Sequence, residues 1–115
     1  AGVIALQGAE ALHRAGSDRF CCDQLKIDGV RIFNHSNLNN DMMDIDGCRD
    51  VIITRVTGDS DDDGITFKST CDRMSENIIV SDCLLSSHCN ALKFGTETTA
   101  GFKNVAISNC VIRRS

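Results

Sequence analysis

A repeat of 26 or 27 residues constrains this chain more strongly than any other feature of its sequence. Four segments align without gaps, and their apolar residues follow the order h-x-h-x-x-h-x-h, except that Gly58 stands at the last place of the second segment. The segments are Asp23–Ile32, Arg49–Gly58, Glu76–Leu85 and Lys103–Ile112. Their first apolar residues keep this spacing along the chain: Leu25, Val51, Ile78 and Val105. Equal spacing indicates copies of one unit that stack on one another, as in solenoid proteins.

Each unit is predicted to contain three short β-strands. The apolar and polar residues alternate with the two-residue period of a strand, and the doublet in the middle marks a bend. A second alternating family lies between the units: Met43–Ile45, Ile65–Phe67 and Leu92–Phe94. We therefore predict an all-β fold, a parallel β-helix of about four turns over residues 21–115. The sequence lacks the pattern of a leucine-rich repeat. A β-sandwich is the main alternative fold, but it does not predict equal spacing of the segments.

Residues 1–20 do not fit the repeat. Val3–Leu6 and the apolar residues that follow them predict a short amphipathic helix that ends near Gly16. Such a helix would cap the open end of the solenoid, and a non-native segment is an equal alternative. The chain begins with Ala1 and shows no recognisable signal peptide, so we expect a mature protein or a fragment.

Composition excludes several classes of function. The chain has 16 acidic and 12 basic residues and a net charge of −4, so it offers no general nucleic-acid surface. It lacks an apolar run of the ~18 residues that a membrane helix needs. Tyrosine and tryptophan are absent, which disfavours ordinary stacking platforms for sugars or bases.

The seven cysteines fit the repeat better than a disulfide framework. Cys83 and Cys110 occupy the inward position that Val30 and Val56 occupy in other units. This placement predicts a ladder of buried thiols, although a disulfide between neighbouring turns is geometrically allowed. Cys22 and Cys48 also share one repeat position. No Cys-x-x-Cys pair exists, so we expect no zinc site, no other metal and no cofactor.

Three carboxylates are predicted to meet where neighbouring turns enter the same strand. If Ile45 and Phe67 share one inward place, then Asp41 aligns with Asp63, and Asp62 lies beside them. Like charges at this range raise the pKa of at least one carboxyl. A protonated acid beside ionised partners is the requirement of glycoside hydrolysis.

Other readings of these polar residues stay open. His88 precedes the next strand of the same family, where it would tune a carboxylate or serve only as a turn residue. Residues 59–64 match half of an EF-hand loop, but Thr70 stands where the bidentate Glu belongs, and a solvated acidic turn is also possible. Outward pairs of Asp44 with Lys93 and of Asp46 with Lys68 are expected at the surface.

These motifs, in this order, resemble glycoside hydrolase family 28, the polygalacturonases and their relatives. Asn39–Asp41 resembles the family's Asn-Thr-Asp, and Asp62–Ile65 resembles its Asp-Asp strand. Ser87–His88, followed by Phe94–Thr96, resembles its Gly-His-Gly turn and Ile-Gly-Ser strand. The closing residues 102–112 resemble the turn that comes next, so the resemblance covers about residues 21–115.

The resemblance implies a right-handed parallel β-helix that cleaves pectic polysaccharide with inversion, in a secreted or periplasmic protein. Asp62 would be the general acid, and Asp41 and Asp63 would activate the water. His88 would orient the acid, and Asn39 would shape the site. From their positions, Lys68 and Lys93 are expected to face an anionic substrate.

Some features depart from the family. The chain ends at Arg113-Arg114-Ser115, before the family's Arg-x-Lys strand, so we expect a piece of such an enzyme. Whether this piece is active in isolation stays open. Alternatives are a noncatalytic β-helix module that binds carbohydrate or a partner, and a structural solenoid that self-associates through its ends. A lyase would need calcium and a basic residue at the site.

Overall fold

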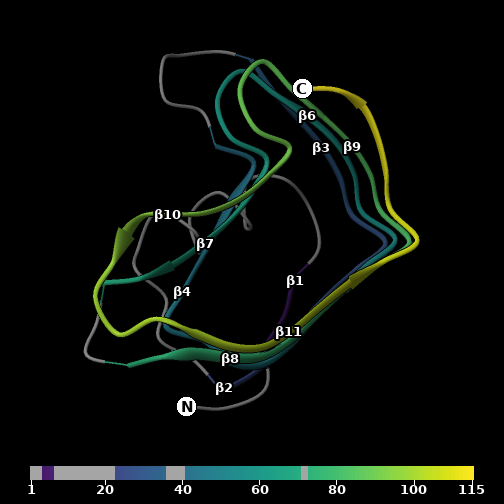
Figure 1. Cartoon of the computed structure of the whole chain (residues 1–115). Helices are drawn as coiled ribbons and strands as arrows, with labels where there is room; N and C mark the ends of the chain where they lie inside the picture. Colours follow the sequence, from purple (N-terminus) through teal and green to yellow (C-terminus); the bar gives the residue numbers. More distant parts are fainter. Residues whose placement is uncertain (1–3, 7–22, 36–40, 71–72) are drawn as a thin grey trace.

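The computed structural model describes residues 4–6, 23–35, 41–70 and 73–115, and these form a parallel β-solenoid (Figure 1). The first sheet, ordered β1-β2-β5-β8-β11, contains β1 (Ile4–Leu6), β2 (Asp23–Asp28), β5 (Arg49–Thr54), β8 (Ser75–Ser81) and β11 (Phe102–Ser108). The second, ordered β12-β9-β6-β3, contains β3 (Arg31–Asn34), β6 (Thr57–Ser60), β9 (Leu84–Ser87) and β12 (Val111–Arg114). The third, ordered β10-β7-β4, contains β4 (Met43–Asp46), β7 (Ile65–Ser69) and β10 (Leu92–Thr98).

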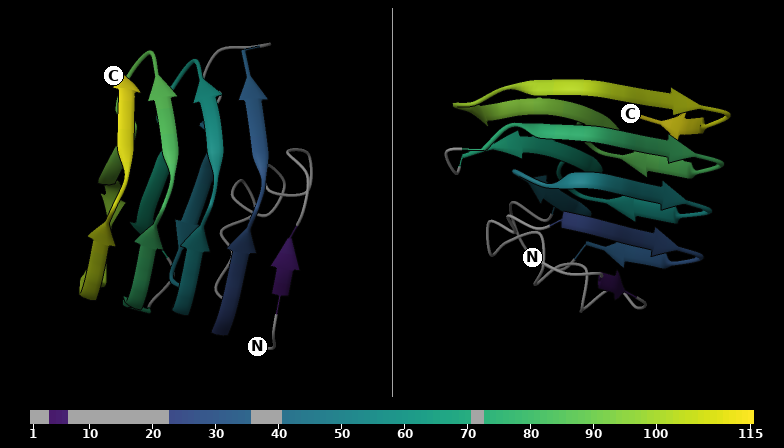
Figure 2. Two further views of the ribbon diagram at one scale, coloured as in Figure 1. Left: turned by 90° about the vertical axis from the view of Figure 1, so that its right-hand side faces the viewer. Right: turned by 90° about the horizontal axis from the view of Figure 1, so that it is seen from below.

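Each turn takes one strand from each sheet, and successive turns stack as layers (Figure 2). Three turns are complete among the described residues, and β11 and β12 follow them as part of a fourth. The predicted all-β parallel β-helix is therefore confirmed. No helix in the described ranges is long and apolar enough to cross a membrane.

The register of the strands confirms the repeat that the sequence predicted. Leu25 pairs with Val51 and Val51 with Ile78, so apolar residues of successive turns form columns. These columns fill the interior, where Phe67 is fully buried and stacks on Phe94 with 5.1 Å between ring centroids. Burial of aliphatic and aromatic side chains between stacked turns supplies the main stabilisation of such a fold.

The bend between the first and second sheets repeats a left-handed backbone conformation in every turn. The residues there have φ between 53° and 68°: Gly29, Arg55, Asp82 and Asn109. Asn and Asp adopt this conformation more readily than other side-chain-bearing residues, and glycine adopts it without strain. The doublet in the middle of each repeat is therefore the bend that the sequence predicted.

Two glycines allow close packing beside the site described below. A Cβ at Gly58 would collide with the end of the buried Met42 side chain, so the glycine makes room for this methionine. A Cβ at Gly64 would collide with the backbone of Ala91 in the next turn. Gly64 directly follows Asp63, so the absence of a side chain here sets how closely the turns approach at the acidic residues.

Some sequence predictions are wrong or fall outside the described residues. Ile4–Leu6 forms strand β1, paired in parallel with β2, and not the start of a capping helix, because its backbone hydrogen bonds extend the first sheet. The remainder of the predicted cap, residues 7–20, lies outside the described ranges. Asp46 is buried and accepts hydrogen bonds from Thr70, so it forms no surface pair with Lys68.

The described cysteines are free thiols: Cys48, Cys83, Cys89 and Cys110. Cys83 and Cys110 lie in register through the pairing of β9 with β12, and Cys83 is buried. Burial raises the pKa of the Cys83 thiol to about 11, which keeps the sulfur protonated and unreactive. The predicted buried thiol is confirmed at Cys83, whereas Cys110 is in register but only half-buried, and Cys22 lies outside the described residues.

Candidate functional site

The acidic residues predicted to converge lie just before the strands of the third sheet. The amide of Met42 donates to the Asp63 carbonyl at 2.8 Å, and that of Gly64 donates to the Asn90 carbonyl at 2.7 Å. These bonds continue the ladder of β4, β7 and β10 and hold Asp41, Asp63 and Asn90 in register. The predicted alignment of Asp41 with Asp63 is therefore confirmed.

Four carboxylates and two lysines gather there, and we call them the carboxylate cluster: Asp41, Asp44, Asp62, Asp63, Lys68 and Lys93. The backbone amide of Asp63 connects three of the acids. It donates to Asp41 Oδ1 at 3.2 Å and to Asp62 Oδ1 at 2.9 Å. One N–H group therefore fixes two carboxylates from neighbouring turns beside each other.

Both lysines of the cluster are paired with its acids. Lys93 Nζ lies 2.7 Å from Asp63 Oδ2, and the Asp63 side chain is only 7% exposed. Lys68 Nζ lies 3.3 Å from Asp44 Oδ2 and 4.0 Å from Asp41 Oδ2. The lysines therefore neutralise part of the charge of the cluster, and an anionic ligand would have to compete with Asp44 and Asp63 for them.

The protonation states of the cluster diverge. Burial raises the pKa of Asp41 to about 7, and the hydrogen bond that protonated Asp41 donates to Asp44 and the charges of Asp44, Asp62 and Asp63 add to the rise. Burial also raises the pKa of Asp63, but hydrogen bonds from Lys93 and Asn90 outweigh it and bring this pKa below its usual value. One acid holds a proton near neutral pH, and its neighbour stays ionised.

His88 does not join this cluster. Leu92 pairs with Ile65, and this register places Asn90, not His88, opposite Asp63. Asn90 Nδ2 donates to Asp63 Oδ1 at 3.0 Å, so an amide occupies the place expected for the imidazole. His88 lies two residues earlier, opposite Asp61. Asn39, the other predicted site residue here, lies outside the described residues.

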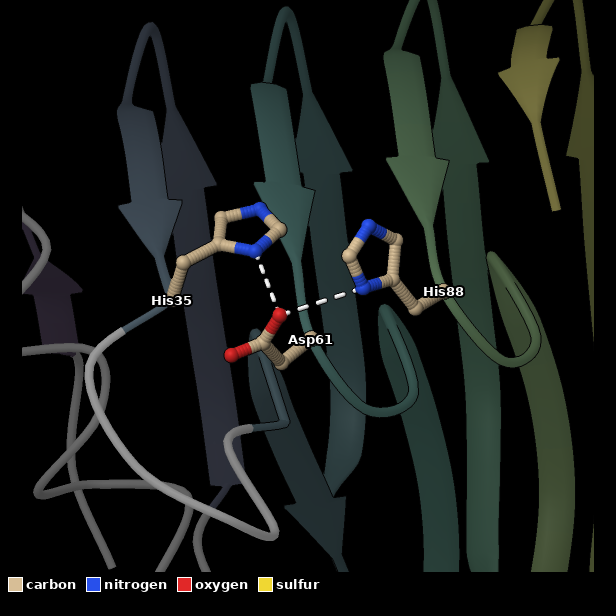
Figure 3. A group of neighbouring side chains, drawn as sticks. All are labelled: His35, Asp61 and His88. Carbon is tan, nitrogen blue, oxygen red and sulfur yellow. Dashed lines mark hydrogen bonds and ion pairs between the residues drawn. The ribbon is translucent and has the colours of Figure 1, made fainter.

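His88 belongs to a second group, which we call the imidazole column: His35, Asp61 and His88 (Figure 3). Asn34 pairs with Ser60 and Ser60 with Ser87, so each member directly follows one strand of the second sheet. Asp61 Oδ1 lies 2.6 Å from His35 Nδ1 and 3.2 Å from His88 Nδ1.

The surroundings of His35 fix its ring. Its Nε2 lies 3.0 Å from Asp59 Oδ1, and Arg114 Nη2 lies 3.4 Å from Asp59 Oδ2. Burial lowers the pKa of His35, but its hydrogen bonds with Asp61 and Asp59 outweigh burial and raise it. A hollow of about 250 Å³ opens beside this group, lined by Asp59, Ser86, Arg113 and Arg114. The hollow lies over the second sheet and not over the carboxylate cluster.

The sequence contained a signal for His35 that was missed. His35, Asp61 and His88 are 26 and 27 residues apart, which is the spacing of the repeat itself. Two sets of side chains within the described ranges have the donor types and proximity to hold a metal ion: the imidazole column, and Asp62 with Asp63 and Cys89.

Comparison with known proteins identifies no relative. No family model matches this sequence, no curated protein matches it, and no solved structure resembles it at a significant level.

Proposed function

We propose that the chain is a glycoside hydrolase of polygalacturonase type that acts on pectic polysaccharide through the carboxylate cluster. The observation that carries the proposal is the divided protonation of Asp41 and Asp63, whose pKa values move in opposite directions within one group. A protonated acid held beside ionised carboxylates is the arrangement that glycosidic cleavage requires. The resemblance of Asn39–Asp41 and Asp62–Ile65 to the family's motifs supplies the substrate class.

The geometry supports a different division of roles from the one that the resemblance implies. Asp41 carries the raised pKa, which makes it the better proton donor for the leaving oxygen. Asp63 is buried and bonded to Lys93 and Asn90, so it positions its neighbours through its amide. Asp62 is half-buried and remains the carboxylate that reaches a water or the sugar.

The stereochemistry of cleavage tests this assignment further. Asp41 Oδ1 and Asp62 Oδ1 accept from the same amide, at 3.2 and 2.9 Å. They therefore lie closer together than the ~6.5–9.5 Å typical of inverting pairs. Proton NMR of the first product would distinguish inversion, which the family resemblance implies, from retention with Asp62 as nucleophile.

The direct test is the release of reducing ends from polygalacturonate and rhamnogalacturonan by the purified chain. Asp41→Asn removes the proton donor and should lower the rate by ~10²–10⁴-fold. Asp50→Asn is the matched control, because Asp50 is exposed on the first sheet and its side chain accepts a hydrogen bond from Asn77 of the next turn. Equal rates in the wild type and Asp41→Asn would refute the proposal.

A noncatalytic carbohydrate-binding module is the second candidate. Phe33 is 76% exposed on the second sheet, and it lines a groove together with Arg31, Arg113 and Asp59. An exposed ring beside cationic side chains suits an anionic glycan. This candidate predicts that polygalacturonate binds without cleavage and that Phe33→Ala weakens binding while Asp41→Asn does not.

A further inference from the structure

The imidazole column has no part in the proposed hydrolysis, yet its three side chains are held in register by the strands that precede them. Three successive turns of the solenoid each contribute one side chain at the same register position, directly after β3, β6 and β9. One carboxylate oxygen of Asp61 faces a ring nitrogen from each side, as Figure 3 shows. A turn that only needed polar residues would not require two imidazoles aimed at one oxygen.

We propose that His35, Asp61 and His88 bind a divalent transition-metal ion, with Zn²⁺ as the best match. Their ligand atoms all lie within 4.8 Å of one another, close enough to converge on one ion. Imidazole nitrogen with one carboxylate oxygen suits zinc and its transition-metal neighbours, whereas Mg²⁺ and Ca²⁺ prefer oxygen ligands only. The inference is independent of the proposed hydrolase activity.

The contacts around His35 match those of a metal-bound histidine. A ligating imidazole usually donates its other N–H to a carboxylate, which fixes the tautomer and the ring orientation. His35 Nε2 faces Asp59 at 3.0 Å, which leaves Nδ1 to face Asp61 and the metal position. Arg114 holds the other oxygen of Asp59 at 3.4 Å. The outer contact that a zinc site needs is therefore already in place.

Binding requires a small rearrangement. His35 Nδ1 and Asp61 Oδ1 now share a hydrogen bond of 2.6 Å, and two ligands of a tetrahedral zinc ion stand about 3.4 Å apart. The ion takes the place of the shared proton, which leaves to solvent. The His88 side chain is 57% exposed and can move toward the ion, and a fourth position on its open side remains for water.

The other candidate group is a poorer match for a metal. Asp63 already accepts from Lys93 at 2.7 Å and from Asn90 at 3.0 Å, so an ion there would have to displace both donors. Cys89 is exposed, and its pKa is raised by desolvation and by the charge of Asp62, which disfavours the thiolate that binds zinc. The two groups can be separated by experiment, since only one contains a sulfur.

The test is titration of the purified, reduced chain with Zn²⁺ after treatment with EDTA, followed by calorimetry, and with Co²⁺, followed by its absorption spectrum. We expect one ion per chain and no thiolate-to-cobalt charge-transfer band. His88→Ala should weaken binding by at least about 100-fold, and Asp59→Asn by about 10- to 100-fold. Cys89→Ser should leave the affinity unchanged.

A stability measurement guards against a variant that fails to fold. A saturating ion that links three turns should raise the unfolding midpoint of the wild type by about 10 °C at a hundred times Kd, and that of His88→Ala much less. In EDTA the two proteins should unfold alike, because His88 is exposed. No binding by the wild type, equal binding by His88→Ala, or loss of binding in Cys89→Ser would each overturn the proposal.

Discussion

The carboxylate cluster and the imidazole column lie side by side where the second sheet passes into the third, and they differ in chemistry. Asp61 belongs to the column, while Asp62 and Asp63, the next two residues, belong to the cluster. In the column, two imidazoles from neighbouring turns face one carboxylate. In the cluster, carboxylates face one another and two lysines neutralise part of their charge.

The contrast between the two groups follows from the way stacked turns align side chains in a solenoid. Each register position continues through the stacked turns, so a column acquires its chemistry from residues about 27 positions apart and not from sequence neighbours. Adjacent positions can then hold unrelated groups. The run of acidic residues at 59–63 looks like one feature in the sequence and is divided between two groups in the structure.

The largest expected effect that separates the two groups is the pH dependence of stability due to Asp41. Its pKa is about 7 in the folded chain and near 3.8 when unfolded, so the folded state binds the extra proton between these values. The contribution of Asp41 to the free energy of unfolding is fully present below about pH 4 and is lost as the pH rises toward 7. Asp41→Asn should flatten this part of a urea-unfolding profile, and an unchanged slope would contradict the pKa.

Removal of a lysine should break the cluster and leave the column intact. Lys93→Met leaves the buried Asp63 carboxylate without its main partner, at a cost of ~2–4 kcal/mol, since Lys93 itself is partly exposed. The pKa of Asp63 should rise, so acid unfolding would begin at a higher pH. The double variant Lys93→Met/Asp63→Asn should recover stability, and a double variant no more stable than Lys93→Met would contradict this account.

A change in the spacing of the turns should distinguish the two groups by position. Gly64→Ala places a Cβ against the backbone of Ala91, at a cost of ~1–3 kcal/mol. The spacing beside Asp63 should widen, and hydrolysis should fall. Zinc affinity should stay within about twofold, because His35, Asp61 and His88 are held by the second sheet. Equal loss of both would mean that the groups are mechanically coupled.

The smallest expected effect is the pH dependence of stability due to His35 in the imidazole column of the metal-free chain. The raised pKa of His35 stabilises the folded state at acidic pH, and this contribution is lost as the pH rises from about 6.5 through the folded value. Denaturant unfolding of His35→Gln should lack this step while it keeps the one due to Asp41. A step that persists in the variant would assign it to another group.

The fold was predictable from the sequence because inward residues repeat at the spacing of the turns, as Leu25, Val51 and Ile78 do. The alignment of Asp41 with Asp63 followed from the same register. The place of His88 was not predictable from its motif, because the register that pairs Leu92 with Ile65 and Ser87 with Ser60 sets His88 opposite Asp61, in the neighbouring column. His35 was missed since its partners lie one and two turns away.

The burial of Asp46 could not be read from alternation alone, because an outward side chain can still be covered by the chain that follows it, here at Thr70. The division of protons between Asp41 and Asp63 also required coordinates. It depends on which carboxylate Lys93 reaches, and sequence spacing does not decide this.

The central claim is that the carboxylate cluster cleaves glycosidic bonds with Asp41 as the acid. The most direct measurement is reducing-end release from polygalacturonate by the wild type, Asp41→Asn and Asp50→Asn at equal concentration. The account predicts release by the wild type and by Asp50→Asn, and a loss of ~10²–10⁴-fold in Asp41→Asn. No release by the wild type, or equal release by all three proteins, would contradict it.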